Sequence, residues 1–315
     1  MHVSVWPWAL FGVLVLSALA LDLGLFQSPR GGQRKLTLRE ATARTAAWAA
    51  LSLLFGVVVL ALYGERVALT YVTAYLLEQS LSIDNIFVFL LIFSELRVPA
   101  SQQRGVLLWG VIGALVTRAA LIAAGLFLLN QFHWVVYPFA ALIIFAAIRL
   151  LWGGQKQRDL VVTACAICST WVARIIPITP QYHGGRFWVR QVDQGGRLVA
   201  TPLLVALIIV ETTDIVFALD SVPAVLAVTR EPFIVYTSNI FAMLGLRSLF
   251  FVLAGVVERY RFLRVGLAAI LTFFGARLLL SDFLEVPNGA SLGVIAAALA
   301  LSVAASLKWP SAATT

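Results

Sequence analysis

The sequence predicts an all-α membrane protein, built as a polytopic bundle of transmembrane helices. Of its 315 residues, 61% are hydrophobic and only 12% are charged, whereas soluble domains contain about half apolar and a quarter charged residues. The apolar residues form continuous runs, unlike the alternating strands of a transmembrane β-barrel. Two cysteines are too few for a disulfide scaffold. A helical protein embedded in the lipid bilayer is the class that remains.

Nine apolar segments are long enough to cross a membrane, at roughly 20 residues for each crossing. They cover residues 3–26, 42–63, 68–94, 105–129, 134–152, 199–228, 233–257, 265–283 and 290–307. The first segment lacks the basic stretch that precedes the apolar core of a signal peptide, so we expect it to remain in the protein. We therefore expect about nine transmembrane helices.

The basic residues of the connections lie almost entirely on one side of the predicted membrane. If the nine segments alternate in direction, 16 Lys and Arg residues fall on one side, and only Arg66 and Arg230 on the other. Cytoplasmic loops carry such an excess of Lys and Arg. We expect a multi-pass protein of the cell membrane with its amino terminus outside and its carboxyl terminus in the cytoplasm. The net charge of +8 is thereby explained by membrane orientation and not by nucleic-acid binding.

The spans and connections divide the chain into five regions. These are 1–66 with two N-terminal spans, 67–152 with spans 3–5, the cytoplasmic loop 153–198, 199–283 with spans 6–8, and 284–315 with the last span and the tail. The middle of the loop, 160–178, is moderately apolar. It is expected to be either a helix lying in the membrane interface or a packed loop.

Five carboxylates lie well inside two of the apolar segments. They are Glu78 and Asp84 in segment 68–94, and Glu211, Asp214 and Asp220 in segment 199–228. Facing lipid, a charge at the bilayer centre would cost about 2.5–3.5 kcal/mol on insertion scales. We therefore expect these acids to face the bundle interior or a water-filled cavity, where intramembrane acids mark functional sites.

The two acidic segments resemble each other and predict an internal repeat of spans 3–5 and 6–8. The corresponding residues are Glu78, Asp84, Asn85 and Arg118 in the first copy, and Asp214, Asp220, Ser221 and Arg247 in the second. Three helices separate the copies, so they would cross the membrane in opposite directions. Inverted repeats with a binding site at their interface are a recurring transporter architecture. Chance similarity between two amphipathic helices is the alternative.

Helical periodicity arranges some of these polar residues on common faces. Glu78, Ser82 and Asn85 form one stripe in an unbroken helix. In the other segment the stripe consists of Glu211, Asp214 and Ser221. Asp84 and Asp220 lie off these stripes, so each either faces a neighbouring helix or lies at a break. Pro223 favours a local break, because proline cannot donate the backbone hydrogen bond of a helix.

The donor groups predict a site for a hard divalent cation. The site offers carboxylates, amides and hydroxyls and contains no Cys or His, a set that suits Mn²⁺, Mg²⁺ or Ca²⁺. Five acids against two arginines leave three negative charges when all ionise, which a dication or protons could offset. The expected metal ligands are Glu78, Asp84, Asp214, Asp220, Asn85, Ser221 and Asn239, supported by Glu211, Arg118 and Arg247. The two arginines would hold the acids when the site is empty.

The same residues also fit roles other than ion transport. A buried ion-pair lattice could simply hold the helices together. The chain could be a membrane scaffold that supports the metallation or insertion of other membrane proteins, with the loop 153–198 as its working part. A membrane-embedded enzyme is not expected, because no nucleophile arrangement or cofactor fingerprint is present. Cys165 and Cys168 form a lone C-x-x-C pair, which lacks the further ligands of a zinc site.

The acidic motifs resemble those of the TerC family of integral membrane proteins, the tellurium-resistance family that includes Alx-type members. The matching stretches are 78–85, 183–187, 211–223 and 237–247, and the similarity extends over roughly residues 40–300. The resemblance implies export of Mn²⁺ from the cytoplasm and places the family's acidic motif residues at Glu78, Asp84, Asp214 and Asp220. The family is also linked to tellurite resistance, which a scaffold could support indirectly. We therefore expect a secondary transporter that exports a hard divalent cation, with Mn²⁺ ahead of Mg²⁺ and Ca²⁺, in exchange for protons.

Overall fold

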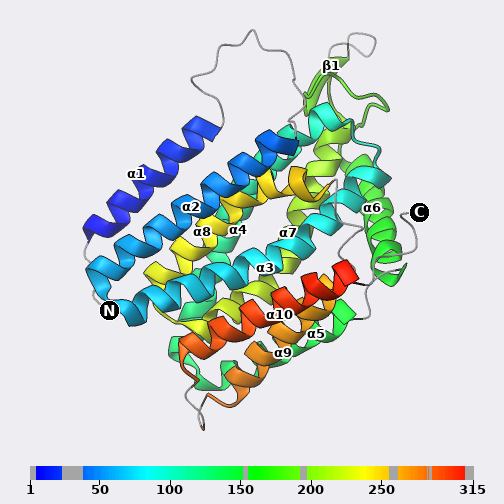
Figure 1. Ribbon diagram of the computed structural model, residues 1–315. Coiled ribbons are helices and arrows are strands. Elements are labelled where there is room, and N and C mark those ends of the chain that lie inside the picture. The colour runs from blue at the N-terminus through cyan, green and yellow to red at the C-terminus, as the bar shows by residue number, and fades with distance from the viewer. Residues whose placement is uncertain are drawn as a thin grey trace.

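A computed structural model describes residues 5–22, 38–151, 155–191, 197–254, 262–281, 283 and 286–308, and these residues are almost entirely helical (Figure 1). The helices of the first half are α1 (Val5–Asp22), α2 (Leu38–Tyr63), α3 (Glu65–Glu95), α4 (Ala100–Gln131), the 3-10 helix η1 (His133–Val135) and α5 (Val136–Leu151). A connecting region follows with α6 (Gln155–Ile175), β1 (Trp188–Gln191) and β2 (Arg197–Ala200). The second half contains α7 (Pro202–Val228), α8 (Pro232–Leu253), α9 (Leu263–Leu279) and α10 (Asn288–Lys308).

Each of the nine predicted apolar segments contains a helix. Seven helical segments of the described chain are long and apolar enough to cross a membrane: α2, α3, α4, η1 with α5, α7, α8 and α10. Helix α9 has 17 residues and the apolar part of α1 covers Val5–Ser17. The all-helical membrane class is thus confirmed, whereas the number of crossings stays a prediction.

The helices pack in pairs that join the two halves of the chain. Helix α3 lies against α8, α4 against α7, and α5 against α9, with further contacts between α3 and α7 and between α4 and α8. Helix α2 covers α8 and α3, and α10 lies beside α3 and α9 (Figure 1). The four helices α3, α4, α7 and α8 therefore form the centre of the bundle.

Glycine and proline shape the turns between these helices. Gly64 joins α2 to α3 with φ 85, a conformation that residues with a Cβ rarely adopt. Pro202 and Pro232 occupy the first turns of α7 and α8, where their missing N–H is not needed. The expected break at Pro223 is wrong, because α7 continues through it to Val228. A helix embedded in a packed bundle accommodates one lost backbone hydrogen bond.

The connecting region is more regular than the sequence pattern indicated. Its middle is the helix α6, which packs on α3 and α7, and not an irregular loop. The strands β1 and β2 pair antiparallel in a hairpin that the sequence pattern did not predict. Tyr182 donates a hydrogen bond from its hydroxyl to the carbonyl of Leu96 at 2.6 Å, which ties this region to the end of α3. Helix α6 and the hairpin lie at one end of the bundle, which we call the α6 end (Figure 1).

Two large apolar clusters and a small third one fill the described part of the bundle, and a polar layer lies between the two large ones. Along α4, Ala114 belongs to the cluster nearer the α6 end and Ile122 to the other. Arg118 lies midway between these two residues. Along α7, Val210 and Ala218 belong to the same two clusters, and Asp214 lies midway. Arg118 and Asp214, both singled out in the sequence, therefore meet at one level, deep in the bundle.

Candidate ion-binding site

The polar layer is centred on the guanidinium of Arg118, which contacts two carboxylates from different halves of the chain. Its Nη1 donates to Glu78 Oε2 at 2.9 Å. Its Nε and Nη2 lie 3.4 Å from the two carboxylate oxygens of Asp214. The side chains of Arg118 and Glu78 are 1% exposed and that of Asp214 is 2% exposed. Two acids therefore share one buried cation and leave one formal negative charge when both are ionised.

Two further side chains complete this group, which we call the central cluster: Glu78, Arg118, Asp214, Ser221 and Asn239. The amide of Asn239 donates to Glu78 Oε1 at 2.7 Å. Ser221 Oγ accepts from Arg118 Nη1 at 3.3 Å. Both side chains are buried. Helices α3, α4, α7 and α8 thus each contribute to the cluster, which brings together four of the expected donors.

Glu78 and Asp214 occupy corresponding positions of the suggested repeat but have different surroundings. Glu78 receives donors on both oxygens. Asp214 is held by two longer contacts from Arg118, and it borders a small cavity of about 10 Å³ that Gly110 and Arg247 also line. A space of this size holds at most about one water molecule. Arg118 therefore holds Asp214 less tightly than it holds Glu78.

Beside the cluster, a buried hydroxyl lacks a hydrogen-bond partner among the described residues. Ser82 is 1% exposed and lies one turn from Glu78 on the same face of α3. Because buried serine hydroxyls normally form a hydrogen bond, the Ser82 hydroxyl is a polar group available beside Glu78. Asn85, the next member of the predicted stripe, is also buried.

Asp220 lies apart from the central cluster. Its carboxylate forms an ion pair with Arg149 of α5, and the two side chains are 16% and 38% exposed. The side chain of Asp84, the corresponding residue of α3, lies outside the described residues. The acidic motifs did not identify Arg149 as the partner of Asp220. The sequence did contain a signal, because a single arginine inside the apolar segment 134–152 needs an acidic partner.

Glu211 is half-buried and lies against α4 instead of joining the central cluster. A Cβ added at Gly113 would come within 2.1 Å of Glu211 Oε1. Glycine at this position therefore leaves room for the carboxylate at the contact between α4 and α7. This role of Gly113 has no sequence signal beyond the presence of glycine in an apolar helix.

Within the described residues, no group of three or more His, Cys, Asp and Glu side chains is close enough to hold a metal ion. The acids are held by arginines instead, Glu78 and Asp214 by Arg118, and Asp220 by Arg149. In the central cluster, one guanidinium thus occupies the space between two carboxylates. For a cation to bind both carboxylates, the guanidinium of Arg118 has to withdraw.

The two cysteines lie in α6, away from the central cluster. Cys165 is buried and Cys168 is half-buried, and both are free thiols. Burial raises the pKa of the Cys165 thiol to about 11. Because the thiolate is the reactive form, Cys165 is a poor nucleophile near neutral pH.

Comparison with known proteins places these residues in a family. The profile described as "Integral membrane protein TerC family" matches residues 63–314. A Myxococcus xanthus protein named "Uncharacterized membrane protein STKORF319" is 46% identical over 300 residues, covering 95% of this chain and 91% of its own. The Escherichia coli K12 protein "Putative membrane-bound redox modulator Alx" is 41% identical over 296 residues, covering 91% and 90%.

A more distant relative is the "Uncharacterized membrane protein" of Rickettsia bellii, 34% identical over 300 residues, with 95% of this chain and 96% of the relative covered. No solved structure matches the chain. The family profile covers most of the sequence, including every residue of the central cluster. The chain is therefore a member of the TerC family of integral membrane proteins.

Proposed function

We propose that this protein is a secondary transporter that exports a hard divalent cation, Mn²⁺ before Mg²⁺ or Ca²⁺, in exchange for protons. The observation that carries the proposal is the central cluster, in which Glu78 and Asp214 share the single guanidinium of Arg118 in the middle of the bundle. A purely structural ion pair would need one acid for one arginine. The second acid leaves a negative charge without a counter-charge, which favours the binding of a dication.

In this proposal the contacts of Arg118 with Glu78 and Asp214 compete with the binding of an ion. Arg118 holds the two carboxylates when no ion is present and withdraws when a dication enters. Ser221 and Asn239 would then supply neutral oxygen ligands, and the hydroxyl of Ser82, which has no hydrogen-bond partner among the described residues, is a further candidate. Oxygen donors of this kind suit Mn²⁺, Mg²⁺ and Ca²⁺. No catalytic nucleophile is invoked, so we place the protein with transporters and not with enzymes.

The remaining predicted ligands would act along the path of the ion. Asp220 lies six residues beyond Asp214 on α7, about 9 Å along the helix. Asp84 and Asn85 occupy the corresponding positions of α3. Glu211 and Arg247 lie toward the α6 end of the cluster and would form the approach to it. A path with several acidic positions lets an ion enter and leave without one very tight site.

The helix contacts support an inverted repeat of α3–α5 and α7–α9. A two-fold axis that exchanges the two triplets converts the α3–α8 contact into the α7–α4 contact, and both are extensive. The pairs α5–α9, α3–α7 and α4–α8 are converted into themselves, and all three are present. With the excess of positive charge at the α6 end, we propose nine crossings with that end in the cytoplasm.

The proposal is tested by Mn²⁺ uptake into inside-out membrane vesicles that carry an outward proton gradient. We expect Glu78→Gln and Asp214→Asn each to reduce uptake to background while the protein remains in the membrane. Glu95→Gln is the matched control, since it removes an exposed acid from the same helix α3, and should retain full uptake. Full uptake in both cluster variants would contradict the proposal.

A scaffold function is the second candidate, and one observation favours it. Ile167, Trp171 and Ile175 are 52%, 61% and 76% exposed along one face of α6, as a surface that contacts lipid or another protein would be. Replacing these three residues by Ser separates the candidates. A transporter would retain Mn²⁺ uptake in vesicles, whereas a scaffold would lose its effect on other membrane proteins.

The name of the Alx relatives suggests a redox role, which the cysteines of this chain do not favour. The raised pKa of Cys165 makes it a weak nucleophile. Side chains three residues apart in a continuous helix also lie about 5–6 Å apart at their Cβ atoms, farther than the roughly 3.5–4.5 Å of a disulfide.

A further inference from the structure

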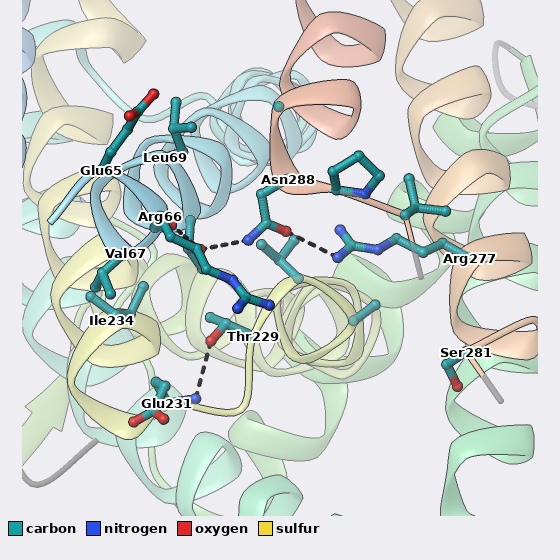
Figure 2. A pocket seen from close by; sticks show the side chains of 16 residues that line it. Glu65, Arg66, Val67, Leu69, Thr229, Glu231, Ile234, Arg277, Ser281 and Asn288 are labelled. Carbon is teal, nitrogen blue, oxygen red and sulfur yellow. Dashed lines mark hydrogen bonds between the residues drawn. The ribbon is translucent and has the colours of Figure 1, made fainter. Parts of the chain in front are cut away.

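A large cavity opens at the end of the bundle opposite α6. It has a volume of about 1080 Å³ and lies between the first turns of α3, the turn from α7 to α8, the last turn of α9 and the first turn of α10. We call it the vestibule. Figure 2 shows that the guanidinium groups of Arg66 and Arg277 both extend into it. Glu65 and Glu231 also line it, so the walls carry both signs of charge. A cavity of this size with charged walls is filled with water.

Only a thin apolar layer separates the vestibule from the central cluster. The vestibule reaches down to Thr70 on α3 and Ile234 on α8. Ala74, one turn below Thr70, is 0% exposed, and Glu78 follows one turn later on the same face. Thr70 and Glu78 are eight positions apart in the helix, a rise of about 12 Å. An opening between the helices at Ala74 would connect the vestibule to the cluster.

Asn288, the first residue of α10, holds the walls of the vestibule together. Its side-chain amide donates to Thr70 Oγ1 of α3 at 2.5 Å, and its Oδ1 accepts from Arg277 Nη2 of α9 at 3.0 Å (Figure 2). Arg277 also donates from Nη1 to Ser291 Oγ at 3.0 Å. The hydroxyl of Thr73 lies 3.4 Å from the backbone carbonyl of Asn288. One side chain of α10 therefore links α3 directly to α9.

These two helices belong to different copies of the proposed repeat, and α10 belongs to neither. Transporters with inverted repeats alternate their access by moving one repeat against the other. Movement of α3 relative to α9 would break the hydrogen bonds of Asn288. The same movement would separate Thr70 from α10 and uncover Ala74.

We propose that the vestibule is the mouth of the ion path opposite α6, and that Asn288 is the latch that keeps this mouth closed to the central cluster. The inference rests on the proposed transport function and adds to it the position of one gate. Arg277, which donates to Asn288, is part of the same latch on the α9 side.

The test measures how fast a cysteine at Ala74 reacts with a membrane-impermeant, positively charged methanethiosulfonate reagent. The chain contains two cysteines, so the background is Cys165→Ser with Cys168→Ser. Thr229→Cys, on the vestibule wall, reports which vesicle preparation, right-side-out or inside-out, exposes the vestibule. Ala74→Cys should react only in that preparation.

Adding Asn288→Ala should accelerate the reaction of Ala74→Cys about tenfold. The variant loses the hydrogen bonds of Asn288, and this loss should shift the equilibrium toward the open gate by about a factor of ten. Thr70→Val removes the same link from the α3 side and should act in the same direction. Ser291→Ala, which removes only the second bond of Arg277, should have a smaller effect. The rate at Thr229→Cys should not change in any variant, which shows that the vestibule is still folded.

An unchanged rate at Ala74→Cys in both Asn288→Ala and Thr70→Val would overturn the latch, as would reaction from the α6 side alone. The labelling needs no metal, so its outcome is distinct from that of the uptake experiment. If uptake depends on Glu78 and Asp214 but the labelling rates do not change, the latch fails and the transport proposal stands. Accelerated labelling without any Mn²⁺ uptake would support a gate at Ala74 and contradict the transport proposal.

Discussion

Two ion pairs of α7 lie only six residues apart and have very different surroundings. Asp214 contacts Arg118 in the central cluster, where both side chains are at most 2% exposed. Asp220 contacts Arg149, and these side chains are 16% and 38% exposed. The first group carries two acids for one arginine and the second a single acid for a single arginine. Burial and charge balance, and not membership in the acidic motif, therefore distinguish the central cluster as the group with one surplus acid.

The largest difference between the two groups should appear when each loses its arginine. Arg118→Met leaves two buried carboxylates without a counter-charge and should lower the free energy of unfolding by about 3–5 kcal/mol. Arg149→Met should cost less than Arg118→Met, because it leaves one carboxylate without its counter-charge and that carboxylate is less buried. Thermal unfolding of the purified variants measures both effects. Equal losses of unfolding free energy in the two variants would show that the central cluster depends on its arginine no more than the pair of Asp220 and Arg149 does.

Asn239 provides a finer test within the central cluster. Asn239→Ala removes the donor to Glu78 Oε1 and leaves that buried oxygen unpaired, at a cost of about 1–3 kcal/mol. Ser238→Ala is the control, because the hydroxyl of Ser238 donates to the carbonyl of Val235 in its own helix. The unfolding temperature of Asn239→Ala should be the lower of the two. An unfolding temperature equal to that of Ser238→Ala would show that Asn239 does not stabilise Glu78 in the cluster.

The contact between α4 and α7 makes the next prediction. Gly113→Ala places a methyl group against the carboxylate of Glu211, which is the end of a flexible side chain and has to turn away, so the cost should be about 1 kcal/mol, the low end of overpacking. Gly105→Ala in the same helix meets no atom within 4 Å and should be neutral or stabilising, because alanine favours helix. Thermal unfolding compares the two variants, and an equal response would place Glu211 elsewhere.

The ion pair of Asp220 and Arg149 allows an effect on transport to be distinguished from an effect on stability. Asp220→Asn should lower the free energy of unfolding less than Arg118→Met does, because it keeps the shape of the side chain and removes a single carboxylate, yet it should reduce Mn²⁺ uptake several-fold if Asp220 lies on the ion path. Vesicle uptake and thermal unfolding are measured on the same preparation. Normal uptake would restrict the ion path to the central cluster.

The smallest effect is expected in α6. Cys165→Ser with Cys168→Ser should retain Mn²⁺ uptake, since both thiols lie away from the central cluster. In the native chain, Cys168 should react with a thiol reagent at about pH 8 well before Cys165, whose pKa is raised to about 11. Loss of uptake in the double variant would favour a redox role.

Much of the membrane architecture could be predicted from the sequence, because the physics involved is local. Twenty apolar residues have few alternatives to a helix in lipid, and a charge among them has to find a partner. Glu78, Asp214 and Arg118 could therefore be singled out before their contacts were known. Helical periodicity also placed Ser82 and Asn85 on a buried face.

The partners of individual side chains could not be predicted in the same way. Periodicity shows which residues share a face of one helix, but not which neighbouring helix that face meets. The acidic motif therefore groups Asp220 with the other acids, although Asp220 pairs with Arg149 of α5. The expected break at Pro223 failed because tertiary packing overrides one lost hydrogen bond. The hairpin of β1 and β2 has strands of four residues each, which are too short to give a pattern.

The central claim is that Glu78 and Asp214 bind a dication in place of Arg118, and equilibrium binding of Mn²⁺ to the purified protein in lipid nanodiscs tests it most directly. We predict that Glu78→Gln and Asp214→Asn each weaken binding by about 100-fold, the equivalent of about 2.7 kcal/mol, while Glu95→Gln binds as tightly as the native chain. Native affinity in both cluster variants would contradict the claim.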